Sequence, residues 1–474
     1  MIFNYLYNMI YQVFVLLIPL VTIPYISRTV GPTGVGINTF TYSITQYFIL
    51  LGTLGINLYG NREIAYKRGD KKKVSKAFWE IEYLLILSVT VATIAFLIFV
   101  SFSKEYQLYY LAQGISVLAV MFDISWFFMG MENFKVTVTR NILVKTISLV
   151  CIFTFVKTKN DLLIYILINS LSVIIGNITL WPYLRKQVMM VPFKELNPLR
   201  HLSPSIALFI PQAAINVYAL LNKPMLKIFG SVESAGFFDS SDKIIKLLIA
   251  LLTALATVVM PRVANSFIKG DREQINRLLT KSFDYISFIA LPLMFGIAAV
   301  SQEFSVLFFG KEFSAVGGIL FVESLVIPII AWASITGNQY LLPTNHTREY
   351  TYSVVAGGIF NLILNIPLII YLGPIGAAIS TIIAELVVTA IQLYYVNKDF
   401  SVIKLFNGVH RYLIAGAIMF VIVFTLSNKI SFSIVHLIIE IGIGFIVYFG
   451  ILVLFKAPIL LEMIQRAKKI VIRH

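Results

Sequence analysis

The sequence has few of the residues that build disulfides, metal centres or soluble surfaces. Its 474 residues include one cysteine, Cys151, which excludes an intrachain disulfide. The five histidines are scattered without the spacing of metal ligands, so we predict no metal site. Only 13% of the residues are charged, whereas soluble domains average roughly 25%. This composition nearly excludes a soluble enzyme.

A glycine-rich stretch, GPTGVG at 31–36, has the glycine spacing of a phosphate-binding loop but lacks its charged half. A loop of the Walker type needs a lysine and then a hydroxyl after the second glycine, to contact the phosphates and magnesium. Ile37 and Asn38 occupy those two positions. We therefore interpret the stretch as a turn between two long helices.

Apolar residues make up 58% of the chain, which is typical of a polytopic membrane protein. The N-terminus lacks the basic region and the cleavage site of a signal peptide, so we expect the first apolar segment to remain as a span. About 14 segments are long enough to cross a bilayer. They are 9–27, 36–58, 78–102, 107–130, 136–156, 161–184, 205–229, 237–260, 282–301, 315–342, 350–372, 375–396, 409–427 and 432–455.

The formal net charge of +15 is distributed unevenly between the two sides of this topology. Most lysines and arginines fall in alternate loops and in the C-terminal tail, including the run from Lys71 to Lys73. The positive-inside rule then places both termini in the cytoplasm. The basic loops are expected to contact anionic membrane lipids. We predict no nucleic-acid binding, because no soluble basic domain is present.

Two halves of the chain repeat each other at an offset of about 200 residues. Arg62 matches Arg262, and Gly69-Asp70 matches Gly270-Asp271. Because each copy holds an even number of spans, both copies enter the membrane from the same side, which predicts a parallel repeat. We expect an all-α polytopic fold: an N-terminal six-helix lobe at 1–196, a C-terminal six-helix lobe at 197–400, and an extra helix pair with a cytoplasmic tail at 401–474.

Two motifs and the layout of the spans resemble a known superfamily. The motifs are R-T-V-G-x-x-G-x-G at 28–36 and N-R-E-x-A…G-D at 61–70. The chain resembles the multidrug/oligosaccharidyl-lipid/polysaccharide exporter superfamily, and specifically its bacterial oligosaccharide flippases for O-antigen or capsule repeat units. The resemblance implies a V-shaped alternating-access transporter in the bacterial cytoplasmic membrane. Its two lobes surround a central cleft, which holds the sugar head group of a lipid-linked substrate.

Polar residues recur at helical spacing inside three of the expected spans, and such residues normally face a bundle interior or a watery cavity. In the eighth span they fall within an arc of roughly 100° at 3.6 residues per turn. They are Asp239, Asp242, Lys243, Lys246, Thr253 and Thr257. The second span carries the matching neutral positions Asn38, Thr41 and Thr45, and the seventh carries Gln212, Asn216, Lys223 and Lys227.

Taken together, the stripes of the seventh and eighth spans hold four lysines against two aspartates, a surplus of two positive charges that predicts an anionic substrate. Two alternatives stay open. The charges of the eighth span can form internal ion pairs that merely hold helices together. Lys227 can extend to the outer interface of the membrane.

Arg28 precedes the glycine turn, where its guanidinium can grip a phosphate with two hydrogen bonds, unless it is an interfacial anchor. In superfamily members that carry lipid pyrophosphates, an arginine at the matching position is thought to contact the pyrophosphate. The chain lacks the arginine that the cell-wall-precursor flippases have in the first half of span one, which argues against that substrate. Ion-coupling candidates inside the spans are Asp123, Glu323 and Glu385, with Glu440 as a further buried acid.

The leading hypothesis is a transporter, not an enzyme, that flips a polyprenyl-pyrophosphate-linked oligosaccharide to the outer leaflet for capsule, O-antigen or exopolysaccharide synthesis. No cofactor is expected beyond H⁺ or Na⁺ coupling or the membrane potential, and a polysaccharide polymerase is an expected partner. The alternative is a drug or cation exporter of the same superfamily, whose cleft should be net acidic. A membrane glycosyltransferase is disfavoured, because the expected outer loops are too short for a catalytic site.

Overall fold

A computed structural model describes residues 2–427 and 433–461. Within these residues every regular secondary-structure element is a helix, and nine helices are long and apolar enough to cross a membrane. The all-helical polytopic class predicted from the sequence is confirmed. The chain divides into two compact units, Met1–Lys227 and Ile228–His474. The lobe boundary drawn at 196/197 from the repeat stays a prediction.

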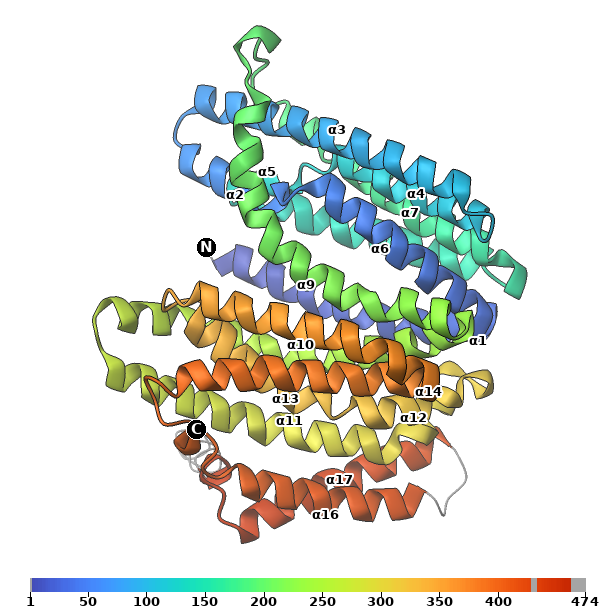
Figure 1. Ribbon diagram of the computed structural model, residues 1–474, viewed down its shortest axis with the longest axis vertical. Helices are drawn as coiled ribbons and strands as arrows, with labels where there is room; N and C mark the ends of the chain where they lie inside the picture. The colour runs from blue at the N-terminus through green and yellow to red at the C-terminus, as the bar shows by residue number, and fades with distance from the viewer. Residues whose placement is uncertain (1, 428–432, 462–474) are drawn as a thin grey trace. The chain divides into compact units, whose positions relative to one another are not determined.

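The first unit is built from long helices joined by short helical turns (Figure 1). Its long helices are α1 (Ile2–Thr53), α2 (Ile56–Lys67), α3 (Lys71–Phe102), α4 (Gln107–Ala119), α6 (Phe134–Phe155), α7 (Leu162–Ile178) and α9 (Leu202–Phe229). Its short ones are η1 (Val120–Phe122), α5 (Ser125–Gly130), η2 (Lys159–Asp161), α8 (Trp181–Leu184), η3 (Phe193–Glu195) and η4 (Pro198–His201).

The second unit is built around a long helix, α11, which contacts most of the other helices of this unit (Figure 1). Its longer helices are α10 (Val232–Ile268), α11 (Arg272–Phe309), α14 (Thr347–Val396), α16 (Val409–Ser427) and α17 (Ile434–Leu454). The shorter ones are η5 (Lys311–Phe313), α12 (Ala315–Glu323), α13 (Val326–Ala333), the π-helical η6 (Ser334–Leu341) and α15 (Val402–Leu405).

The glycine stretch at 31–36 is a helix kink. Gly31 has a φ of 70° and a ψ of 179°, so it breaks α1 where the first and second predicted spans meet. Only glycine adopts this backbone conformation at low cost, and Pro32 follows it because its ring suits the start of a new helical run. Gly373, with a φ of 58°, divides α14 in the same way between the eleventh and twelfth predicted spans. The interpretation of the stretch as a turn is confirmed.

The repeated Gly-Asp pairs are helix-capping sites. The Asp70 carboxylate accepts hydrogen bonds from the backbone N–H groups of Lys72 and Lys73 at 2.9 and 3.2 Å, at the start of α3. The Asp271 carboxylate accepts one from Gln274 at 2.9 Å, at the start of α11. The first backbone N–H groups of a helix have no partner within it, so each aspartate satisfies donors that would otherwise be unpaired.

An aromatic cluster fills the core between α2, α3 and α5 in the first unit. Phe78 stacks on Trp126 with ring centroids 5.5 Å apart, and Phe127 meets Phe78 edge to face at 5.2 Å. Gly60 lies directly against the Trp126 ring, where a side chain would not fit. Most of the other tryptophan and phenylalanine rings of this region join the same buried cluster. The cluster fixes α2 and α5 against α3 at the end of the unit where Asp70 caps the helix.

Replacing Asp70 with alanine is expected to lower the melting temperature of the purified protein at neutral pH. The N–H groups of Lys73 and Lys72 hold the pKa of the Asp70 carboxyl below its usual range. The stability that this carboxylate adds is present above the pKa of the unfolded chain and is lost as the pH falls through the lower pKa of the folded state. The melting difference between wild type and Asp70→Ala should therefore shrink in acid.

Asp70→Asn is the matched control, because asparagine caps a helix without titrating in this range. It should stay close to the wild type at neutral pH. A wild-type advantage over Asp70→Ala that is equal at neutral and acidic pH would contradict the capping role.

Candidate functional site

The polar positions of α1 are buried and satisfied inside the first unit. The hydroxyls of Thr41 and Thr45 each donate a 2.8 Å hydrogen bond to the carbonyl four residues earlier in the helix. Asn38 is half-buried and accepts a 3.1 Å hydrogen bond from the side-chain amide of Gln113 on α4. In this conformation the neutral stripe therefore packs within the unit, and its role in binding remains a prediction.

The cations predicted on α1 and α9 occupy different environments. Arg28 is exposed on α1, close to the kink at Gly31, whereas Lys223 and Asn216 are half-buried on α9. Gln212 also belongs to α9, but its side chain lies outside the described part of the structure.

Lys227, near the end of α9, has a partner that sequence analysis did not identify. Its ammonium group forms an ion pair with Glu105, which lies in the turn between α3 and α4. It also lies 5.4 Å from the centroid of the Phe40 ring and 5.6 Å from that of Tyr106. The hydrogen bond from Lys227 keeps the pKa of the Glu105 carboxyl below its usual range, so this carboxyl stays charged at neutral pH. This pair reduces the cationic surplus predicted from the sequence.

The charged stripe of α10 consists of two ion pairs along one helix of the second unit. Asp239 pairs with Lys243 at 2.5 Å and Asp242 pairs with Lys246 at 2.8 Å, each four residues apart. Both aspartates are buried, whereas the lysine side chains are 43% and 54% exposed. The acidic ends are thus fixed inside the unit, and the ammonium groups extend toward accessible space. The four charged residues of the predicted polar face thus pair along this helix, and their role in binding stays a prediction.

Further polar positions of α10 lie beyond and within the stripe. The Thr253 hydroxyl donates to the Ile249 carbonyl at 3.0 Å, and the side chain of Thr257 lies outside the described residues. Between the two aspartates, Ser241 donates a 2.5 Å hydrogen bond to the carboxylate of Glu323 on α12. Glu323 is only 2% exposed, so this bond connects a buried acid directly to the helix that carries the stripe.

The remaining ion-coupling candidates belong to different units. Asp123 precedes α5 in the first unit and accepts a 3.0 Å hydrogen bond from the backbone N–H of Ser125, two residues later. Glu385 is half-buried on α14 in the second unit. Among the described residues, no group of three histidine, cysteine, aspartate or glutamate side chains is arranged to hold a metal ion.

A polar cluster in the first unit was missed by sequence reasoning. Glu80, fully buried on α3, accepts hydrogen bonds from the His201 ring at 3.0 Å and the Asn197 backbone at 2.9 Å, and pairs with Arg200. The other ring nitrogen of His201 lies 2.5 Å from the Tyr59 hydroxyl. In the sequence, the only sign of this cluster is an acidic residue, Glu80, inside an apolar span. Its partners cannot be identified there, because they lie more than a hundred residues further along the chain.

This cluster fixes the segment before α9 to α2 and α3. Burial lowers the pKa of His201, which keeps the imidazole neutral at physiological pH. A neutral ring has one N–H and one bare nitrogen. A carboxylate only accepts, so the bond to Glu80 requires Nε2–H, and Nδ1 then accepts from the Tyr59 hydroxyl; the Arg200 Nε also lies 3.2 Å from this Nε2. The start of α9, the helix with the predicted lysines, is thereby held in a defined position within the first unit.

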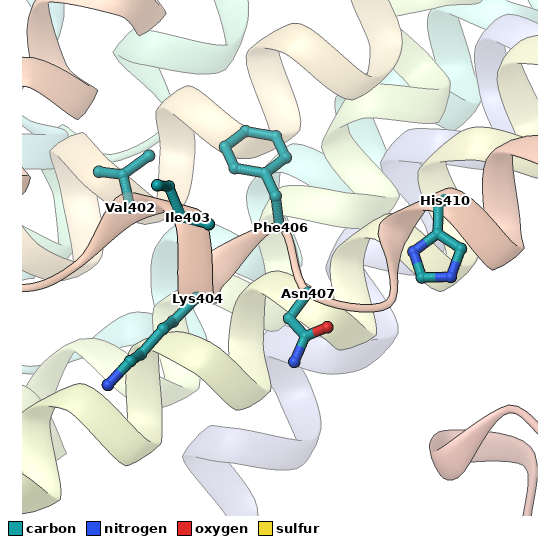
Figure 2. A pocket seen from close by; sticks show the side chains of 6 residues that line it. All are labelled: Val402, Ile403, Lys404, Phe406, Asn407 and His410. Carbon is teal, nitrogen blue, oxygen red and sulfur yellow. The ribbon is translucent and has the colours of Figure 1, made fainter.

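An open pocket of about 510 Å³ lies in the connection between α14 and α16. Figure 2 shows its lining, from which Lys404 and Asn407 extend away from the Phe406 ring. The full lining is Val402, Ile403, Lys404, Phe406, Asn407 and His410. It contains none of the residues predicted to bind substrate or ions.

Two family models match the chain. One, described as polysaccharide biosynthesis protein, matches residues 2–267, and the other, described as lipid II flippase MurJ, matches residues 206–444. A protein of Escherichia coli (strain K12) named as an O-antigen transporter is 26% identical over 405 residues, with 84% of this chain and 96% of that protein covered.

Solved structures of similar fold include two transporter types. Lipid II flippase MurJ, in an inward closed conformation, has a TM-score of 0.77 at 16% identity and covers 95% of this chain and 98% of its own. An inward-facing multidrug resistance transporter of the MATE family has a TM-score of 0.61 at 12% identity, over 80% and 97% of the two chains. At these identities the likeness establishes the fold.

Tyr59→Phe is expected to lower the stability of the protein by about 1 to 3 kcal/mol, because it leaves a buried ring nitrogen of His201 without its donor. Thermal melting of the purified protein measures the effect. Tyr66→Phe, which removes a hydroxyl from an exposed tyrosine of the same helix, is the control and should melt like the wild type. Equal melting of the two variants would show that the Tyr59–His201 bond does not hold the segment before α9.

Proposed function

The chain belongs to the polysaccharide biosynthesis protein family, and we propose that it flips polyprenyl-pyrophosphate-linked oligosaccharide units from the cytoplasmic to the outer leaflet. The observation that carries this proposal is the pair of family matches, which together extend from residue 2 to residue 444. The E. coli relative, covered over nearly its whole length, is named for the transport of O-antigen. We infer that the oligosaccharide units flipped by this protein are used to build a surface polysaccharide of the same general kind as O-antigen.

The physical task explains why such a chain needs polar groups inside apolar helices. A pyrophosphate and a string of sugars cannot enter hydrocarbon without losing their hydration, at a cost of several kcal/mol for each unpaired polar group. A protein lowers that cost by offering replacement partners along the path. The stripe of α10 offers ammonium groups of this kind, with buried carboxylates beneath them.

The ion pairs on α10 leave their lysines within reach of a substrate anion. Each lysine side chain is about half exposed, whereas its aspartate partner on the same helix is buried. Because removal of the lysine would strand a buried carboxylate, an incoming phosphate would share Lys243 or Lys246 with that aspartate. Arg28, exposed beside the α1 kink, would add a planar guanidinium that binds phosphate oxygens in pairs. The process requires no covalent step, so we propose a transporter without enzymatic activity.

We propose that an ion gradient or the membrane potential drives the cycle. Among the three predicted coupling acids, Glu323 is favoured because the Ser241 hydroxyl joins it to α10 between Asp239 and Asp242. A change in the protonation or ion occupancy of Glu323 would then act directly on the helix that carries the lysines. Asp123 and Glu385 remain candidates for the same role.

The cellular setting follows from the sequence and stays part of the proposal. Both termini would face the cytoplasm of a bacterial cell, in the cytoplasmic membrane, as the positive-inside rule predicts. Membrane lipids would contact the basic loops, and a polysaccharide polymerase would take the flipped units at the outer leaflet. A drug or cation exporter is the competing function, and the lysines of α10 disfavour it because they would repel a cationic substrate.

The function is tested by extracting lipids from cells that lack this protein and measuring their surface polysaccharide. Accumulation of polyprenyl-pyrophosphate oligosaccharides together with a loss of surface polysaccharide is the expected result, and mass spectrometry of the lipid would identify the sugars. Unchanged lipids and an unchanged surface, together with altered drug sensitivity, would replace the proposal with the exporter function.

Lys246→Ala is expected to reduce complementation of such cells by roughly tenfold to a hundredfold, because charge-assisted hydrogen bonds to a phosphate contribute about 1.5 to 3 kcal/mol. Surface polysaccharide is measured at matched protein levels. Lys67→Ala is the matched control, since Lys67 forms a similar pair with Glu63 four residues away on α2. Full complementation by Lys246→Ala would exclude this lysine from the substrate path.

A further inference from the structure

The connection between α8 and α9 exposes large apolar side chains. Met190 and Phe193, in what we call the α8–α9 segment (residues 185–199), are 84% and 68% exposed. In Figure 1 this segment is the green loop that extends beyond the start of α3. Neighbouring large apolar side chains that stay exposed mark a surface that contacts a partner or a membrane.

Hydrogen bonds hold the α8–α9 segment along the first turns of α3. The backbone N–H of Met189 donates to the Ser75 hydroxyl at 2.9 Å, and the indole N–H of Trp79 donates to the Met189 carbonyl at 3.0 Å. Further along, the Phe193 ring meets the Tyr83 ring edge to face, with centroids 5.3 Å apart. The exposed apolar side chains therefore belong to a surface that is attached to the first unit.

Basic side chains flank the apolar ones within the segment. Arg185, Lys186 and Lys194 outnumber its single acid, Glu195. All four of these side chains are exposed. The segment thus carries a net positive charge on both sides of Met190, and this charge is complementary to a layer of phosphates.

The neighbouring face of α3 continues the same pattern. Lys72, Lys76, Trp79 and Tyr83 follow one another at three- or four-residue spacing, which places them along one face of the helix. Trp79 and Tyr83 contact the α8–α9 segment, so the two lysines lie on the face of α3 that adjoins it. Tryptophan and tyrosine are enriched at the boundary between membrane and water. The surface therefore combines interfacial aromatic rings with lysines.

The charges distinguish a membrane surface from a protein partner. The centres of protein interfaces are depleted in lysine, whereas here lysines lie around the apolar side chains. A membrane leaflet places phosphates directly above its acyl chains, which matches this arrangement. The segment also joins the candidate span that ends at Leu184 to α9, so it lies at the edge of the membrane. By the positive-inside rule this is the cytoplasmic edge.

We propose that the α8–α9 segment and the adjoining face of α3 form a binding surface for anionic phospholipids of the cytoplasmic leaflet. Met190 and Phe193 enter the border of the acyl chains, and Lys186 and Lys194 contact lipid phosphates. The inference concerns the lipids around the protein and does not rest on the proposed transport of oligosaccharides.

The test places a fluorescent label at residue 190 of the purified full-length protein. Met190→Cys is made in a Cys151→Ala background, since Cys151 is the only native cysteine. The protein is reconstituted in equimolar vesicles of phosphatidylcholine and phosphatidylglycerol, with the acyl chains of one lipid or of the other brominated. Bromine quenches a label that it touches, so the ratio of the two quenching efficiencies reports which lipid gathers beside residue 190.

Tyr371→Cys in the same background is the matched control. Tyr371 is also 84% exposed, and it lies in the stretch 349–397, which contains no lysine or arginine. Brominated phosphatidylglycerol is expected to quench the label at residue 190 roughly fivefold more strongly than brominated phosphatidylcholine, which is the effect of about one lysine near an anionic surface. The two lipids should quench the label at residue 371 equally.

The double substitution Lys186→Gln/Lys194→Gln separates the charges from the apolar contact. It should bring the quenching ratio at residue 190 toward one, while both lipids still quench the label because the apolar side chains still enter the leaflet. High salt should lower the ratio of the protein with its lysines in the same direction. Equal quenching by the two lipids in the protein with its lysines would overturn the proposal. Quenching by neither lipid would also overturn it, and would leave the surface to a soluble protein partner.

The protein without a label provides a second measurement should the cysteine variants fail to fold. Its melting temperature in detergent is expected to rise more on addition of phosphatidylglycerol than of phosphatidylcholine. The extra rise should be smaller in Lys186→Gln/Lys194→Gln, where both substituted side chains are exposed. The same extra rise in both proteins would contradict the assignment of the lipid to this surface.

Discussion

The structure depends on one constraint: polar groups carried by apolar helices must find partners within the protein, because hydrocarbon offers none. The chain meets this constraint mostly over short distances. The hydroxyls of Thr41 and Thr45 bond to the preceding turn of their own helix, and the aspartates of α10 pair with lysines one turn later. On α1 and α10, local pairing satisfies these groups within the helix itself before it packs against its neighbours.

Local pairing also suits a transport path. An ion pair formed across two helices would resist their separation, since breaking a buried pair strands a charge. Pairs formed along α10 stay intact when neighbouring helices move, and their half-exposed ammonium groups remain able to meet a substrate anion. The second unit thus combines a buried acidic layer with accessible cations, which is the arrangement that an anionic head group in an apolar surrounding requires.

Features set by neighbouring residues were predictable from the sequence. The kink at Gly31 follows from a glycine and a proline between apolar runs, and the caps at Asp70 and Asp271 follow from an aspartate before a helical pattern. Because α10 is a regular helix, the phase of its polar residues predicted a single face. Family resemblance correctly pointed to the fold and to the flippase class.

Features set by tertiary contacts were not predictable. Glu105 lies in a turn, and nothing in its sequence surroundings indicates that it pairs with Lys227 more than a hundred residues away. The position of His201 in the sequence predicts no role for it, although it contacts both Glu80 and Tyr59. A count of charges in spans therefore overestimated the cationic surplus, because one partner lay outside the spans. Partner identity needs three-dimensional packing, which helical periodicity does not contain.

The most direct test of the central claim is a flipping assay with the purified protein in liposomes containing a polyprenyl-pyrophosphate oligosaccharide. A glycosidase added outside digests the oligosaccharide of the outer leaflet only. The account predicts that liposomes with the protein expose the inner pool to digestion, whereas protein-free liposomes protect it, once the required ion gradient or potential is applied. Equal protection in both, with the protein folded and correctly inserted, would contradict it.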